Sequence, residues 1–205
     1  MTVFNEAFDR LPLVAILRGL RPDEAEGIGA ALYDAGFRLI EVPLNSPDPF
    51  DSIARLARSL PADAVLGAGT VLESDAVARV RDAGGKLIVM PHADTEVIRA
   101  AKAAGMFCVP GVATPTEAFA AIRAGADALK LFPAELVTPA IVRALGAVLP
   151  KNIKLLPVGG INPGNMADFR AAGVAGFGLG SALYKPGMDA ATVAANAKAF
   201  VDAWK

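Results

Sequence analysis

A repeating unit of strand-like and helix-like segments constrains the fold of this chain more than any other feature. Each apolar run is followed by a turn and an amphipathic Ala-rich stretch, and five of these stretches end in an Ala-Gly pair. Glycine directly after a helix adopts the left-handed conformation that ends it, so the pairs predict helix ends. The apolar runs begin near Leu13, Leu39, Ala64, Leu87, Met106, Ala128, Lys154 and Ala175. The pairs are Ala35-Gly36, Ala83-Gly84, Ala104-Gly105, Ala124-Gly125 and Ala172-Gly173.

Helix starts are also recognisable, because cap residues, early prolines or first-turn acids precede three of the amphipathic stretches. They are Pro22-Asp23-Glu24, Asp94-Thr95-Glu96 and Thr114-Pro115-Thr116-Glu117. Strands separated by helices pair in parallel, since each helix is a crossover. Eight such units predict an α/β fold, a (β/α)8 TIM barrel forming one domain over residues 1–205, with an open doubly wound sheet as the weaker alternative. Because about 250 residues are typical of such barrels, the helices and loops must be short.

The composition excludes several classes of function. The formal net charge is −1, so no global charge favours nucleic acid or an anionic membrane surface. The chain has one cysteine, Cys108, so an internal disulfide is impossible. With only one histidine besides, His92, a four-ligand zinc site is improbable. We expect no cofactor and no metal. The apolar segments are too interrupted to span a bilayer, and residues 1–10 lack the apolar core of a secretory signal. We therefore expect a cytoplasmic protein.

A glutamate occupies an unexpected place in the predicted second strand. Side chains alternate along a strand, so Glu41 and Asn45 share the parity that faces the barrel interior, whereas Ile40 and Val42 face the helices. An interior carboxylate is costly unless it is paired or neutralised. Glu41 is therefore either half of a structural ion pair or a functional group.

A lysine lies at the corresponding place in the predicted sixth strand. Lys130 faces inward between Ala128 and Phe132. Burial lowers the pKa of a lysine and makes its amine a nucleophile for carbonyl groups. The alternative is that Lys130 is only the partner of Glu41. A nearby carboxylate stabilises the ammonium, so desolvation must outweigh it for the nucleophilic role.

Further polar groups and glycines follow other strands, at the end where such barrels carry their reactive groups. Arg18 ends the first strand, where it can bind a carboxylate ligand or pair with Glu41. Thr70 ends the third strand, after small residues that either leave room for a ligand or allow tight packing. Glycine loops follow the last two strands, at Gly159-Gly160 and at Gly178-Leu179-Gly180-Ser181. Barrels commonly bind phosphate there, on backbone N–H groups and a short helix N-terminus. His92 is more typical of a polar rim residue than of a catalyst.

The chain resembles the family of 2-keto-3-deoxy-6-phosphogluconate and 2-keto-3-deoxy-6-phosphogalactonate aldolases over nearly its whole length. The segments that carry the resemblance are Ala15-Ile16-Leu17-Arg18-Gly19, residues 40–47, residues 67–72, residues 128–133, Val158-Gly159-Gly160 and residues 178–181. The resemblance implies a class I aldolase, typically a homotrimer, that forms a Schiff base and cleaves a phosphorylated sugar acid to pyruvate and D-glyceraldehyde 3-phosphate.

Residue roles follow from the same resemblance. Lys130 matches the Schiff-base lysine and Glu41 the general acid/base. Arg18 and Thr70 match positions that bind the substrate's carboxylate end, and Pro91 and Phe132 match the pocket wall. The phosphate-site positions are Gly159, Gly160, Gly180 and Ser181. The chain departs from many relatives in having Met90 before Pro91, where Ser or Thr is frequent, so this part of the wall differs from theirs.

Two positions favour one branch of the family. Gluconate-type members usually carry an Arg soon after the strand-two Glu and a Thr just before the Gly-Gly pair. In the first place this chain has residues 43–47, which include Asn45 and no Arg, and in the second it has Val158. The pattern predicts the phosphogalactonate substrate, in galactonate catabolism. The alternatives are the gluconate C4 epimer, 4-hydroxy-2-oxoglutarate, a phosphosugar isomerase or epimerase that uses Glu41 as its base, and a non-catalytic phosphate-binding barrel.

Overall fold

Parallel strands and helices alternate through residues 2–205, the part of the chain that the computed structural model describes. The strands are β1 (Leu13–Ile16), β2 (Leu39–Pro43), β3 (Val65–Gly69), β4 (Leu87–Val89), β5 (Phe107–Val109), β6 (Gly111–Val112), β7 (Ala128–Leu131), β8 (Lys154–Pro157) and β9 (Phe177–Leu179). The helices are α1 (Val3–Arg10), α2 (Pro22–Asp34), α3 (Pro49–Ser59), α4 (Asp75–Asp82), α5 (Thr95–Ala103), α6 (Pro115–Ala124), α7 (Pro139–Val148), α8 (Met166–Ala171) and α9 (Ala190–Trp204).

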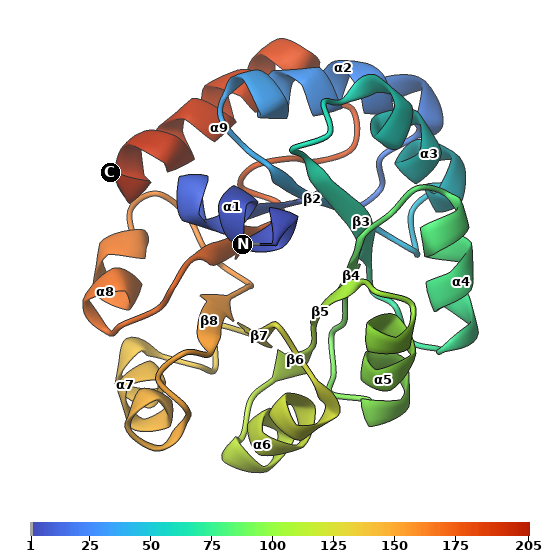
Figure 1. Ribbon diagram of the computed structural model, residues 1–205. Coiled ribbons are helices and arrows are strands. Elements are labelled where there is room, and N and C mark those ends of the chain that lie inside the picture. Colours follow the sequence, from blue (N-terminus) through green and yellow to red (C-terminus); the bar gives the residue numbers. More distant parts are fainter. Residues whose placement is uncertain (1) are drawn as a thin grey trace.

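The strands form two hydrogen-bonded parallel sheets, with the helices from α2 to α9 around the outside (Figure 1). The larger sheet has the order β5-β4-β3-β2-β1-β9 and the smaller one β6-β7-β8. The prediction of an α/β fold with parallel strands is confirmed. A single eight-stranded sheet is not what the pairing shows, because the fifth predicted strand is split at Pro110, which has no N–H to continue the pairing.

Several backbone contacts connect the two sheets. The Lys130 N–H donates to the Pro110 carbonyl at 2.9 Å, between β5 and β6, and Val158 forms an isolated parallel bridge with Gly178 of β9. These contacts bring the end of β8 beside β9 and the end of β5 beside β7.

The predicted helix boundaries are confirmed. All five glycines of the Ala-Gly pairs have positive φ, between 71° and 109°. At the other ends, α2 begins at Pro22, Asp94 caps α5, and Thr114 and Glu117 form a capping box on α6. Local chemistry at helix ends is legible in a sequence because caps involve only residues three or four apart.

Side chains of alternating parity separate into two apolar clusters, as predicted. The inner cluster, inside the ring of strands, includes Val14, Leu39 and Ala128, and the outer cluster, beneath the helices, includes Ile40, Val42 and Leu129. Glu41 and Lys130 have the parity of the inner cluster, and they are 1% and 5% exposed.

Helix α1 covers one end of the ring of strands (Figure 1), a feature that the repeating pattern did not predict. Its residues Phe4, Ala7 and Phe8 belong to the inner cluster, and the Phe4 ring stacks on Phe107 at 4.9 Å between centroids. With this end covered, the carboxyl ends of the strands form the open end. No helix among residues 2–205 is long and apolar enough to cross a membrane.

Candidate active site

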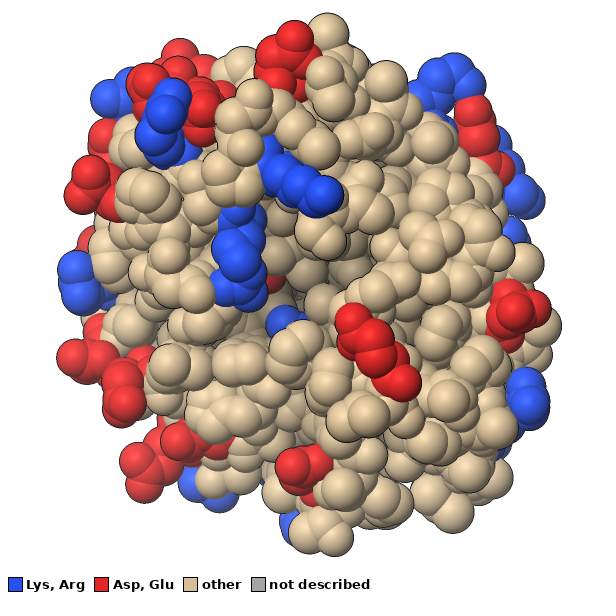
Figure 2. Space-filling model, turned by 180° about the vertical axis from the view of Figure 1, so that it is seen from behind, with Lys and Arg blue, Asp and Glu red and all other residues tan. Residues whose placement is uncertain are grey.

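A pocket of about 490 Å³ opens at the carboxyl ends of the strands. On the side opposite α1 the surface is hollowed near its centre, and Lys and Arg side chains lie beside the hollow (Figure 2). The ends of β1 and β7 and the loops after β1, β2, β7, β8 and β9 supply the lining. The pocket brings together nine of the predicted site residues, which are Arg18, Asn45, Lys130, Phe132, Val158, Gly159, Gly160, Gly180 and Ser181.

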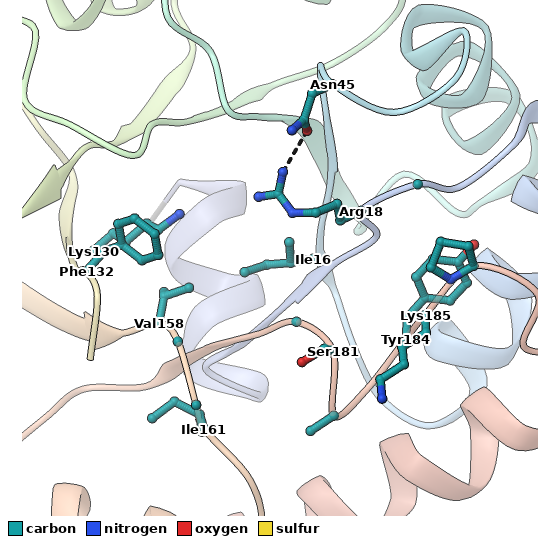
Figure 3. A pocket seen from close by; sticks show the side chains of 16 residues that line it. Ile16, Arg18, Asn45, Lys130, Phe132, Val158, Ile161, Ser181, Tyr184 and Lys185 are labelled. Atoms are coloured by element: carbon teal, nitrogen blue, oxygen red, sulfur yellow. Dashed lines mark hydrogen bonds between the residues drawn. The ribbon is translucent and has the colours of Figure 1, made fainter. Parts of the chain in front are cut away.

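Lys130 lies at the inner end of this pocket, on β7. Burial lowers the pKa of its amine, Arg18 acts in the same direction, and the Glu41 charge opposes both without overcoming them. The Nζ atom lies 4.6 Å from the centroid of the Phe132 ring, which shields it (Figure 3). The requirement that desolvation outweigh the carboxylate is therefore met, and this amine loses its proton more readily than a solvated lysine.

Glu41 lies below the pocket, in a small internal space of about 10 Å³ that Lys130 and Val158 also line. Burial raises its pKa to about 7, although Lys130 and Arg18 lower it. Its Oε2 atom is buried without a hydrogen-bond partner, and it forms no ion pair with Lys130 in the described chain. A carboxyl in this state exchanges a proton near neutral pH, as a general acid/base requires.

Gly69 provides the space that the Glu41 carboxyl occupies. A Cβ atom at this position would lie 1.9 Å from Glu41 Oε2 and 2.2 Å from its Cδ. Position 67 requires glycine for another reason, because a Cβ at Gly67 would lie 1.8 Å from the Leu87 carbonyl oxygen of β4. The small residues at the end of β3 therefore serve tight packing, one of the two readings that the sequence allowed.

Arg18, Asn45 and Thr70 form a hydrogen-bonded group at the rim. Arg18 donates to Asn45 Oδ1 at 2.7 Å, a bond drawn in Figure 3, and to Thr70 Oγ1 at 3.4 Å. Thr70 has a φ of 54°, which is unusual for a β-branched residue. Arg18 is thus directed along the rim rather than paired with Glu41, and its remaining N–H groups stay available for an anionic ligand.

The two glycine loops line the other side of the pocket. Gly159 and Gly160 have φ values of 112° and 60°, and a Cβ at Gly180 would meet no atom within 4 Å. In the described chain the N–H groups of Gly160 and Ser181 have no protein acceptor. The short helix expected here is absent from residues 181–184, which form a single turn because the Leu183 and Tyr184 N–H groups both donate to Gly180.

Three positions near the end of β4 lie away from the pocket. Pro91 is not among its lining residues, and its carbonyl lies close to Gly111, where a Cβ would be 2.4 Å away. Met90 is fully buried in the outer cluster, with its sulfur 3.8 Å from Cys108 Sγ, so it does not form the wall. His92 is exposed, as expected for a rim residue.

The sequence reasoning missed two lining residues that carry polar side-chain groups. Tyr184 and Lys185 follow the Gly180-Ser181 loop and contribute to the pocket (Figure 3). Their signal in the sequence was only proximity to that loop, because the turn after β9 determines which way they point.

Comparisons with known proteins show the family of this chain and the fold it shares with solved structures. The family model for KDPG and KHG aldolases matches residues 4–197. A probable 2-dehydro-3-deoxy-6-phosphogalactonate aldolase of Rhizobium meliloti (strain 1021) is 51% identical, covering 94% of this chain and 91% of the relative. The 2-dehydro-3-deoxy-6-phosphogalactonate aldolase of Escherichia coli (strain K12) is 47% identical, covering 96% of each chain. A solved structure described as native KDPGal superimposes with a TM-score of 0.93, at 48% identity over 95% of each chain.

Proposed function

The chain belongs to the KDPG and KHG aldolase family, and we propose that it cleaves 2-dehydro-3-deoxy-6-phosphogalactonate into pyruvate and D-glyceraldehyde 3-phosphate. The observation that carries this proposal is the arrangement of two buried ionisable groups. Lys130 has a lowered pKa at the inner end of an open pocket, and Glu41 is buried beside it with one oxygen unpartnered. Burying both groups destabilises a fold, so their presence favours a chemical role.

Lys130 is the nucleophile in this proposal. Its neutral amine attacks the C2 keto carbon of the substrate and forms a carbinolamine, which loses water to give a protonated imine. The positively charged nitrogen of that imine then withdraws electrons from the C3–C4 bond. The covalent link therefore supplies the polarisation that a metal would otherwise provide.

Glu41 moves the protons. It transfers a proton to the departing hydroxyl during dehydration of the carbinolamine, and it accepts the C4 hydroxyl proton as the C3–C4 bond breaks. Glyceraldehyde 3-phosphate leaves, the enamine is protonated at C3, and water releases pyruvate and the free amine. A pKa of about 7 suits both directions of transfer. The internal space of about 10 Å³ beside Glu41 is near the size of one water molecule, which can relay the proton.

The ends of the substrate fit the two sides of the pocket. Arg18, held by Asn45 and Thr70, binds the carboxylate end. The phosphate end binds to the backbone N–H groups and hydroxyl of the loops that contain Gly159, Gly160, Gly180 and Ser181. Phe132 covers the reacting amine. Pro91 is left without a contact to the substrate in this arrangement.

The preference for the galactonate epimer rests on Val158 and on the names of the two relatives. Val158 lines both the pocket and the internal space beside Glu41, and it has no hydrogen-bonding group for the C4 hydroxyl. A single hydrogen bond contributes about 1–2 kcal/mol of discrimination between epimers, so some turnover of the gluconate epimer is expected.

Two finer features of architecture belong to the same proposal. The split β5–β6 pair acts as one strand, and the Val158–Gly178 bridge joins the last two strands, so that both sheets form one closed eight-stranded barrel. Leu136, Ile141 and Val148, in and just before α7, are 68%, 40% and 58% exposed, and we infer that they contact other copies in a homotrimer. Light scattering showing a monomer would contradict the trimer.

Borohydride trapping tests the nucleophile. Incubation with pyruvate and borohydride reduces the imine to a stable amine, and mass spectrometry of the digest should find the added mass on the Lys130 peptide alone. Lys86, which is exposed before β4, serves as the reference lysine. An unmodified protein, or a label on another lysine, would contradict the Schiff-base assignment.

Kinetics with the two C4 epimers test the substrate. We expect a higher kcat/KM for 2-dehydro-3-deoxy-6-phosphogalactonate than for the gluconate epimer. Replacement of Val158 by Thr, which has a similar shape and adds a hydroxyl, should reduce the difference. A clear preference of the wild-type protein for the gluconate form would overturn the substrate assignment and leave the aldolase assignment intact.

A further inference from the structure

Lys185 is a cation in the pocket that the proposed reaction does not use. Three basic residues line the pocket, and Arg18 and Lys130 serve the keto-acid end of the substrate. Figure 3 shows Lys185 and Ser181 on one side of the pocket and Lys130 on the opposite side. In the described chain Lys185 forms no ion pair, and its side chain donates no hydrogen bond.

Two anchored neighbours fix where the Lys185 side chain begins. Tyr184 is 2% exposed, and its hydroxyl lies 3.4 Å from Glu24 of α2. Pro186 packs on Gly19, where φ is 83° and a Cβ would lie 2.6 Å from Pro186 Cγ. The backbone of Lys185 is therefore held against α2 and the loop after β1, while no hydrogen bond or ion pair in the described chain fixes its side chain.

The negative charge at the glycine-loop side of the pocket favours a cation there. A phosphate monoester carries a charge of about −1.5 to −2 at pH 7. Glu135 adds negative charge nearby, because its Oε2 atom lies 2.5 Å from the position of a Cβ at Gly159. Backbone N–H groups and the Ser181 hydroxyl bind a phosphate but carry no net charge, so they do not reduce its repulsion from Glu135 as a cation would.

We propose that Lys185 forms an ion pair with the phosphate group of the substrate and thereby selects phosphorylated over unphosphorylated substrates. The inference rests on the proposed function, to which it adds a specificity-determining residue. Lys185 acts as the substrate binds and has no part in proton transfer, because it lies across the pocket from Lys130. Removing its charge therefore weakens binding of the phosphorylated fragment without changing imine formation with pyruvate.

The test compares aldehyde acceptors in the condensation direction. The variants are Lys185→Gln and Lys185→Arg. The control is Lys86→Gln, which removes the same charge from an exposed residue at the amino ends of the strands, away from the pocket. For Lys185→Gln we expect the KM for D-glyceraldehyde 3-phosphate to rise about 10-fold, as for loss of a charge-assisted hydrogen bond. The KM for pyruvate and the rate with unphosphorylated D-glyceraldehyde should stay at wild-type values, and Lys185→Arg should retain tight binding. Equal values for Lys185→Gln and Lys86→Gln would overturn the proposal.

Binding of inorganic phosphate, measured by calorimetry, separates this inference from the proposed function. Phosphate should bind the wild-type protein and Lys86→Gln equally and Lys185→Gln more weakly, with the difference shrinking at high salt. Equal binding by all three proteins would overturn the role of Lys185 whatever the reaction. A wild-type protein that binds phosphate through Lys185 but condenses neither aldehyde would instead refute the proposed function alone.

Discussion

Replacing Glu41 by Gln should remove a pH dependence from the stability of this protein. Burial raises the pKa of Glu41 from its ordinary 4.5 to about 7. Ionising a carboxyl held at that pKa costs the folded state roughly 3 kcal/mol relative to the unfolded chain. Glutamine has nearly the same shape and cannot ionise, so the variant lacks this cost at every pH.

The direction of the effect follows from proton binding. Between pH 4.5 and about 7 the folded protein holds the Glu41 proton while the unfolded chain has released it. The free energy of unfolding therefore falls as pH rises through this window and levels off above it. Below pH 4.5 both states are protonated, and Glu41 contributes no cost.

Urea denaturation at fixed protein concentration, at pH 5 and at pH 8, measures the effect. Taking the change in unfolding free energy between the two pH values cancels the cost of burying the Gln amide, which is the same at both. The wild-type protein should lose roughly 2.5 kcal/mol more than Glu41→Gln does, because the unfolded chain is already mostly ionised at pH 5. The control is Glu26→Gln on the exposed face of α2, which should behave as wild type. An equal loss in Glu41→Gln and wild type would refute the reasoning that burial dominates at this carboxyl.

Other perturbations have equally direct outcomes. Glu41→Gln should fold and lose about 10²-fold or more in turnover, as expected for loss of general acid/base catalysis, and near-normal kcat would return Glu41 to a structural role. Gly69→Ala should also lose most turnover, because its Cβ would lie 1.9 Å from Glu41 Oε2. The control Gly146→Ala, whose Cβ would meet no atom within 4 Å, should be near wild type. Full activity of Gly69→Ala would show that the carboxyl lies elsewhere. Asn45→Ala should raise the KM for pyruvate because Arg18 loses its 2.7 Å partner, and an unchanged KM would remove Arg18 from the carboxylate end. Activity should survive EDTA, and a loss that a divalent metal restores would contradict the imine mechanism.

The sequence alone determined which segments become strands and helices. Alternation of apolar runs with amphipathic stretches, and capping by residues close in sequence, are local effects, so β2, α6 and the left-handed glycines lie where the pattern placed them. Parity alone also directed Glu41 and Lys130 to the interior, because a strand has only two faces. The repeat could not indicate α1, which follows no strand and packs on an end of the ring.

Only the tertiary structure decided how these groups act on one another. Desolvation must outweigh the attraction between Lys130 and Glu41. Whether it does depends on where the fold places two residues separated by three strand–helix units, and on the space that Gly69 leaves. Lys185 enters the pocket because Tyr184 reaches α2 and Pro186 packs on Gly19, contacts between residues far apart in sequence. A pattern of residue types records which faces are buried, but pKa values and pocket linings depend on which atoms meet when the strands are brought together.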